Sequence, residues 1–152
     1  MSDFQIVSNN DIVAVDWQRL AEILERSGLG KRDVTKLQKA FNHSQFRYLG
    51  YYNGELVATA RAISDLTSAS YLCDVAIDPL YQGKGWGRIL MEKIMEDLSP
   101  LGKTFIYSVP DKIKFYQQFE FYELLTAMIH VDQQTLPGMI HAGYISIDPA
   151  GS

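Results

Sequence analysis

The positions of apolar residues predict a mixed order of strands and helices in the first third of the chain. Residues Phe4 to Val7 alternate between apolar and polar, which is typical of a short strand. Apolar residues then recur at helical spacing from Trp17 to Leu24, with Asp16 placed to cap the helix and Gly28 to Gly30 placed to end it. We predict a second helix over Asp33 to His43.

The pattern changes from helical to strand-like after residue 45. Two runs rich in aromatic and β-branched residues, 46–52 and 56–62, flank the pair Asn53-Gly54. Because an Asn-Gly pair between such runs favours the tight turn of a β-hairpin, we expect two antiparallel strands here.

The second half of the chain alternates short strands and helices. We predict strands at 71–77, 103–109, 121–125 and 128–131, and helices at 85–98 and 110–119. The tail 133–152 contains one β-like stretch, Gly143 to Ile147, which either pairs within the same domain or exchanges with a second copy. Together these elements predict an α/β sandwich around a largely antiparallel sheet.

Composition and charge limit the classes of protein and partner. With 152 residues, of which 47% are hydrophobic, the chain suits one globular domain spanning 1–152. The formal net charge of −4 and the sequence pI near 5.3 argue against a nucleic-acid partner. No apolar run is long enough to span a bilayer, and the N-terminus lacks the features of a signal peptide. We therefore expect no membrane partner.

The single cysteine and the three histidines give no sign of a disulfide framework or a metal site. Cys73 lies among apolar residues with no histidine near it in sequence, so we interpret it as a buried structural thiol. The histidines show no ligand spacing with each other or with carboxylates, and we predict no metal. A reducing compartment fits this cysteine usage, and cytoplasm is the expected location.

The most informative segment is the glycine-rich stretch from Val75 to Met91. An apolar run ends at Asp78-Pro79, passes through Gly83, Gly85 and Gly87, and enters a helix-like run. This order of strand, glycine loop and helix builds an anion site, because the first N–H groups of a helix have no internal partner. The glycine spacing excludes both the dinucleotide fingerprint and the P-loop.

Two motifs in this chain resemble those of the GCN5-related N-acetyltransferase (GNAT) superfamily. The first is Gln82-Gly83-Lys84-Gly85-Trp86-Gly87, directly after the strand that ends in Val-Ala-Ile-Asp-Pro. The second is the run from Phe115-Tyr116 to Phe121. Glu120 stands where the superfamily usually has glycine, so this turn either avoids positive φ or places Glu120 under mild strain.

The resemblance implies a fold, a cosubstrate and the residues that bind it. The implied fold is a mixed, mostly antiparallel sheet of six to seven strands with about four flanking helices and a splayed parallel pair. The implied cosubstrate is acetyl-coenzyme A. Its pantetheine arm would pair with the backbone of Val75, Ala76 and Ile77, and its pyrophosphate would lie on Gln82, Gly83, Lys84, Gly85, Trp86, Gly87 and Arg88.

The resemblance also indicates how acetyl transfer would proceed. Tyr116 matches the tyrosine that protonates the departing thiolate, and its proton stays in place at neutral pH. The base is open: Asp74 is one candidate, a solvated or capping role for Asp74 is an equal alternative, and a water chain could replace it. We expect direct transfer to a primary amine in a ternary complex.

The identity of the acceptor is open at this stage. A small-molecule amine is the first hypothesis, and a protein lysine or N-terminal amine is the second within the same chemistry. A non-catalytic module that binds acyl-coenzyme A is the alternative from another class. A homodimer is compatible with each hypothesis, because the tail could supply an exchanged strand.

Overall fold

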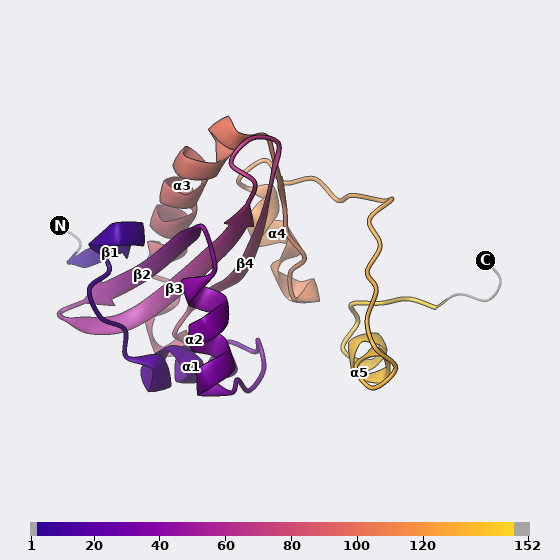
Figure 1. Cartoon of the computed structure of the whole chain (residues 1–152), viewed down its shortest axis with the longest axis horizontal. Helices are drawn as coiled ribbons and strands as arrows, with labels where there is room; N and C mark the ends of the chain where they lie inside the picture. The colour runs from indigo at the N-terminus through magenta and orange to yellow at the C-terminus, as the bar shows by residue number, and fades with distance from the viewer. Residues whose placement is uncertain (1–2, 148–152) are drawn as a thin grey trace. The chain divides into compact units, whose positions relative to one another are not determined.

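A computed structural model describes residues 3–147 of the chain. The sheet has five strands in the order β1 to β5: β1 (Phe4–Ser8), β2 (Phe46–Tyr52), β3 (Glu55–Ser64), β4 (Ala69–Ile77) and β5 (Lys103–Phe105). Neighbouring strands are antiparallel except for β4 and β5, which are parallel. The predicted mixed, mostly antiparallel sheet with one parallel pair is therefore confirmed (Figure 1).

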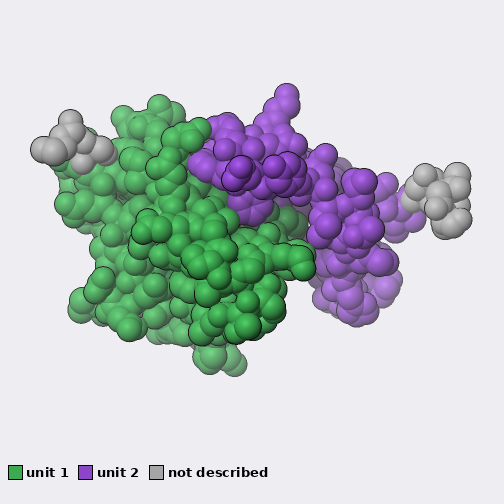
Figure 2. Space-filling model, turned by 90° about the horizontal axis from the view of Figure 1, so that it is seen from above, with its two compact units in different colours: residues 1–107 green, residues 108–152 purple. Residues whose placement is uncertain are grey.

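The chain divides into two compact units, coloured separately in Figure 2. Unit 1 covers residues 1–107 and contains the whole sheet with α1 (Trp17–Arg26), α2 (Val34–Asn42) and α3 (Trp86–Leu98). Unit 2 covers residues 108–152 and contains α4 (Ile113–Gln117) and α5 (Leu136–His141). Each unit is described by itself below.

Helices cover both faces of the sheet in unit 1. Leu49 of β2 belongs to a core cluster with residues of α1 and α2, such as Leu24 and Phe41. The adjacent Tyr48 has the opposite orientation, because side chains alternate along a strand, and its hydroxyl donates to Asp97 of α3 at 2.8 Å. We call these the α1–α2 face and the α3 face of the sheet (Figure 1).

Local sequence signals account for most element boundaries. The Asp16 side chain accepts from the Arg19 N–H at the start of α1, and Asp33 accepts from the Lys36 N–H at the start of α2. Asn53 and Gly54 have φ values of 49° and 78°, as the tight turn between β2 and β3 requires. The predicted cap at Asp16 and the predicted hairpin are confirmed, and Asp33 is a second cap that was not predicted.

The prediction of six to seven strands is wrong, since residues 3–147 form five. The predicted strand at 103–109 is shortened to Lys103–Phe105, and 121–125, 128–131 and 143–147 form no strand. Side chains in these runs are apolar yet exposed, Leu125 at 93% and Met128 at 98%. Strand propensity reflects how well side chains pack on a paired, half-buried sheet. An apolar run that has no partner strand therefore does not become a strand. The tail instead forms α5.

Candidate active site

The two parallel strands separate after a short ladder. β4 and β5 pair at Ala69 with Lys103, Ser70 with Thr104 and Tyr71 with Phe105, and the ladder ends there. In the described part of the chain, the remainder of β4 therefore has a neighbouring strand on its β3 side only. The predicted cofactor residues Val75, Ala76 and Ile77 lie in this remainder.

A bulge interrupts β4 just before those residues. Cys73 pairs with Arg61 and Ala76 pairs with Thr59, so two residues of β4 oppose one residue of β3. Asp74, the first residue of the bulge, has a φ of 54°. The bulge turns the backbone of Asp74 and Val75 away from regular pairing at the point where the strands have separated.

The glycine loop follows β4 and is exposed from Gln82 to Gly85. Gly83 and Gly85 have φ values of 83° and 82°, which disfavour other residues, and a Cβ at either would meet no atom within 4 Å. No acceptor among residues 3–147 bonds the N–H groups of Gly83 through Gly87. Gly85 is the N-cap of α3, so the loop amides and the positive end of the helix coincide.

The remaining loop residues have distinct surroundings. Gln82 shapes the turn, because its N–H donates to Pro79 O and its side chain donates to Ile77 O at 3.0 Å. Trp86 is buried, and its ring stacks on that of Phe4 with ring centroids 4.8 Å apart. The Lys84 ammonium lies 5.9 Å from the Trp86 ring centroid, and the exposed Arg88 lies 3.9 Å from Glu92 on the next turn.

A buried carboxylate, Asp78, connects the loop to helix α1. Asp78 Oδ2 lies 2.6 Å from Arg19 Nη2 and 3.2 Å from Arg26 Nη1, while Oδ1 accepts from the Leu80 N–H. Burial by itself would raise the pKa of Asp78, but the Leu80 N–H and the two arginines outweigh it and lower that pKa. This ion-paired group holds the backbone that leads into the glycine loop.

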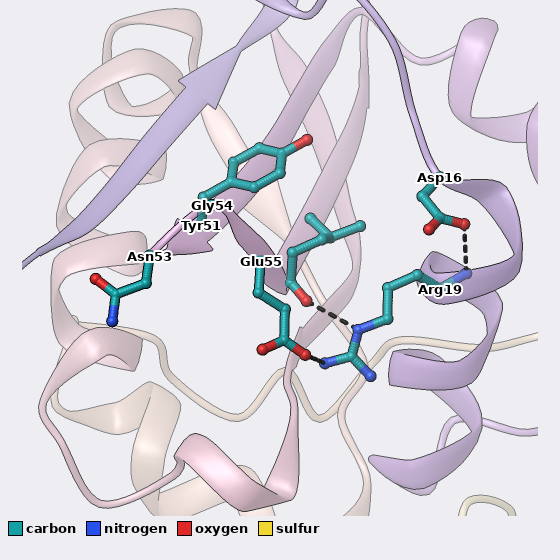
Figure 3. Close-up of a pocket in the computed structure, with 7 residues that line it drawn as sticks. Asp16, Arg19, Tyr51, Asn53, Gly54 and Glu55 are labelled. Atoms are coloured by element: carbon teal, nitrogen blue, oxygen red, sulfur yellow. Dashed lines mark hydrogen bonds and ion pairs between the residues drawn. The ribbon is translucent and has the colours of Figure 1, made fainter.

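An open pocket of about 460 Å³ lies on the other side of Arg19, between α1 and the β2–β3 turn (Figure 3). Its lining includes Asp16, Tyr51 and Glu55. Arg19 donates from Nε to Leu56 O at 3.0 Å and lies 3.3 Å from Glu55 Oε1. Arg19 thus braces the hairpin against the end of β4, and the pocket contains none of the residues predicted for the cofactor.

Asp74 lies between two arginines that sequence reasoning missed. Arg32, in the α1–α2 connection, donates from Nη2 to Asp74 Oδ1 at 2.7 Å and from Nη1 to Oδ2 at 3.0 Å. Arg61 donates from Nε to Asp74 Oδ2 at 2.8 Å. Burial raises the pKa of Asp74, yet the two guanidinium groups outweigh burial and hold it below its usual value. No spacing links Arg32, Arg61 and Asp74 in sequence, because the bulge and a loop bring them together.

Cys73 is buried, as predicted, and burial raises the pKa of its thiol to about 11. A thiol in that state is a weak nucleophile at neutral pH. Among residues 3–147, no three His, Cys, Asp or Glu side chains gather as a metal site would require. No helix in the same range combines the length and apolar character needed to cross a bilayer.

Tyr116 lies in unit 2 on α4, buried against aromatic neighbours. Its ring contacts Phe115 and Phe121, with centroids 5.1 Å and 5.9 Å away. Burial raises the pKa of its phenol to about 12. Its hydroxyl donates to no acceptor among the described residues.

Glu120 ends the α4 segment in a left-handed conformation, with a φ of 64°. Its N–H donates to Gln117 O, and the Phe121 N–H donates to Tyr116 O at 3.4 Å, the paired bonds of a Schellman motif. Of the two alternatives raised by this glycine replacement, the structure supports the strained one, since Glu120 adopts positive φ.

Comparison with known proteins agrees with this fold and loop. The model of the acetyltransferase (GNAT) family matches residues 14–121. Serotonin N-acetyltransferase 2, chloroplastic, of Oryza sativa subsp. japonica is 33% identical over 70% of this chain and 56% of its own length. Histone acetyltransferase TAP1 of Glycine max is 29% identical over 75% of this chain and 54% of its own length. The chain thus spans about half the length of these relatives.

Solved structures show the same fold. A GNAT-family acetyltransferase of Streptococcus pneumoniae TIGR4 superposes with a TM-score of 0.70 at 20% identity, covering 86% of this chain and 98% of that one. This chain belongs to the GNAT acetyltransferase family, as its family match over residues 14–121 shows.

Proposed function

We propose that this protein transfers the acetyl group of acetyl-coenzyme A directly to the primary amine of a small molecule. The observation that carries the proposal is the row of unbonded amides from Gly83 to Gly87 at the start of α3. They offer five N–H donors and a helix dipole to a pyrophosphate. Lys84 and Arg88 add positive charge beside them.

The pantetheine arm would run from this loop along the unpaired side of β4. The Asp78 N–H donates to Val57 O, so Ala76, two residues earlier, also directs its main-chain groups to β3, whereas Val75 and Ile77 direct theirs to the free side. The Ile77 carbonyl already accepts from Ser27 and Gln82, so Val75 and the Ile77 N–H are left to pair with the arm. An extended ligand binds a strand edge through main-chain hydrogen bonds. The thioester would then lie beside the bulge at Asp74.

The chemical roles in this reaction would be divided as follows. Tyr116 would give its proton to the thiolate as the C–S bond breaks, while the amine nitrogen forms the new bond to the acetyl carbon. Asp74 is a poor base in its ion-paired state, so we assign it to holding Arg32 and Arg61. A water chain would remove the proton from the amine.

The names of the relatives favour an amine acceptor without choosing its size, because one refers to serotonin and another to histone. We place the protein in the cytoplasm on its cysteine usage, although the name of the rice relative includes "chloroplastic". An amine panel that contains both small amines and lysine peptides tests the acceptor class through thiol release.

Calorimetric binding of acetyl-coenzyme A to wild type and to Gly85→Val tests the donor site. Gly85 has a φ of 82°, which a Val residue disfavours, so the substitution would distort the backbone that carries the amides. We expect at least a 10-fold loss of affinity in the variant, since several hydrogen bonds to phosphate depend on this backbone. Gly30→Val, at another positive-φ glycine remote in sequence, is the control. Equal affinity in wild type and Gly85→Val would refute the loop assignment.

A further inference from the structure

Positive charge is concentrated on the α1–α2 face of the sheet beside the bulge. Arg61 pairs with Arg47 across the β2–β3 ladder, and Arg61 pairs with Cys73 on the β4 side. Arg47 precedes Tyr48, which faces α3, so Arg47 lies on the same face as Arg61. Like charges directly opposite each other on one face destabilise a sheet.

Asp74 neutralises only part of this charge. Three guanidinium groups, those of Arg32, Arg47 and Arg61, meet a single carboxylate, and no other ion pair to them occurs within residues 3–147. The Arg32 guanidinium is satisfied, because it donates two hydrogen bonds to Asp74 and also donates to Leu29 O. The Arg47 guanidinium has no such partner among the described residues. Support of the bulge therefore explains the presence of Arg32 but not that of Arg47.

Unused donors accompany the unbalanced charge. Arg61 gives Nε–H to Asp74 and one Nη1–H to Ser44 Oγ at 3.3 Å, which leaves its Nη2 group without an acceptor in the described chain. The Arg47 Nε atom is buried and likewise has no hydrogen-bond partner there. A buried donor such as the Arg47 Nε–H is normally satisfied, and a guanidinium fork suits the paired oxygens of a carboxylate or phosphate.

Apolar surface adjoins the arginines. Tyr71 lies two residues before Cys73 and therefore on the same face, and its ring stacks on that of Tyr107 at 6.3 Å and 9°. A ligand anchored on the guanidinium groups would find aromatic surface next to its anionic group.

We propose that the acceptor of this transferase is an amine that also carries an anionic group, a carboxylate or a phosphate, bound by Arg61 and Arg47. This inference rests on the proposed function, because the cluster adjoins the bulge where the thioester would lie. The anionic group would lie between the two arginines, replace their mutual repulsion with shared attraction, and direct the amine toward β4.

Two matched pairs of amines test the proposal with saturating acetyl-coenzyme A: tyrosine against tyramine for a carboxylate, and phosphoethanolamine against ethanolamine for a phosphate. We expect wild type to prefer the anionic member of at least one pair by 10-fold or more in kcat/KM, and the preferred pair identifies the group. Equal or better use of both neutral members would overturn the proposal.

Variants separate recognition from structural support. Arg47→Gln and Arg61→Gln should each raise KM for the anionic member by about 10- to 100-fold, with less than about 3-fold change for the neutral one. Arg61→Lys should retain part of the preference, and Lys39→Gln, an exposed charge on α2, should retain all of it. Equal losses for both members of a pair would show a structural role and contradict the proposal.

Arg47→Gln gives a readout that a supporting residue would not produce. The substitution removes a like-charge pair and no ion pair to a described residue. The melting temperature of the variant should therefore equal or exceed that of wild type, while recognition of the anion is lost. If no amine causes thiol release, that result refutes the proposed acetyl transfer but does not refute the anion site. Calorimetry of phosphoethanolamine with excess coenzyme A then decides this inference, since binding that survives both glutamine variants would refute it.

Discussion

At the scale of single residues, burial and ion pairing separate the carboxylates and phenols of this protein by role. Asp78 and Asp74 are held ionised by arginines, whereas Tyr116 is held protonated by burial. An acid that keeps its proton to high pH and a carboxylate that cannot accept one do different chemistry. Only the tyrosine is suited to give a proton to a thiolate.

Tyr116→Phe should therefore lower kcat by about 100-fold or more, the usual contribution of a general acid, while the Kd for acetyl-coenzyme A stays within about 2-fold. Since burial raises the phenol pKa to about 12, the wild-type rate should show no fall due to this group below about pH 11. Stopped-flow thiol release and calorimetry measure the two effects. An unchanged kcat would show that water or another group protonates the thiolate.

Asp78→Asn should lower the free energy of unfolding by about 3 kcal/mol, because it leaves the charges of Arg19 and Arg26 facing a neutral amide. The folded pKa of Asp78 lies below its unfolded value, so its stabilisation is present above about pH 4 and is lost as pH falls further. Urea denaturation at several pH values measures this.

The Asp78→Asn variant should lose less stability than wild type between about pH 4 and pH 2, since it lacks that titrating group. Asp111→Asn, which changes an exposed carboxylate in unit 2, serves as the control. Parallel acid profiles for wild type and Asp78→Asn would contradict this assignment.

At the scale of elements, the sequence predicts those features that depend only on residues close together in the chain. Caps at Asp16 and Asp33, the Asn53-Gly54 turn and helix α3 all follow from neighbouring residues. The extent of β5 and the absence of strands between residues 121 and 147 depend on which edges find partners, and no local pattern encodes that. The same holds for the arginines around Asp74, which come from a loop and two strands.

β5 also depends on one close backbone approach that no local pattern of residues predicts. A Cβ on Gly102 would lie 2.2 Å from Ser68 O, and Gly102 has a φ of 97°. Gly102→Ala should therefore lower the free energy of unfolding by about 3 kcal/mol. Gly30→Ala, with a φ of 92° and no atom within 4 Å, should cost only about 1 kcal/mol. Thermal and urea unfolding compare them, and equal losses would mean that the contact with Ser68 is unimportant.

At the scale of the whole molecule, the two units differ in how much they bury. Unit 1 contains nearly every buried apolar side chain of the described chain, whereas Tyr116 is the buried one in the described part of unit 2. Local opening requires little free energy where few apolar contacts are lost. The stability of the molecule therefore resides in the sheet and its three helices.

Hydrogen exchange should reveal this difference. We expect backbone amides of β2, β3 and β4 to exchange slowest, through global unfolding, and amides of 121–135 to exchange fastest, because that stretch has no regular ladder or helix. Mass spectrometry of peptic fragments over minutes to hours measures both. Comparable protection in the two regions would show that unit 2 is stabilised by more than its own contacts.

The free side of β4 has a consequence for how the family can diversify. In the proposed complex the donor is bound through the peptide groups of Val75 and Ile77, which requires little of their side chains beyond fitting the sheet, so those positions could vary without loss of thioester binding. The proposed choice of acceptor, by contrast, would depend on the long side chains of Arg47 and Arg61 on the α1–α2 face. One half of the proposed reaction would thus rest on the backbone, and the other half would be open to change by single substitutions.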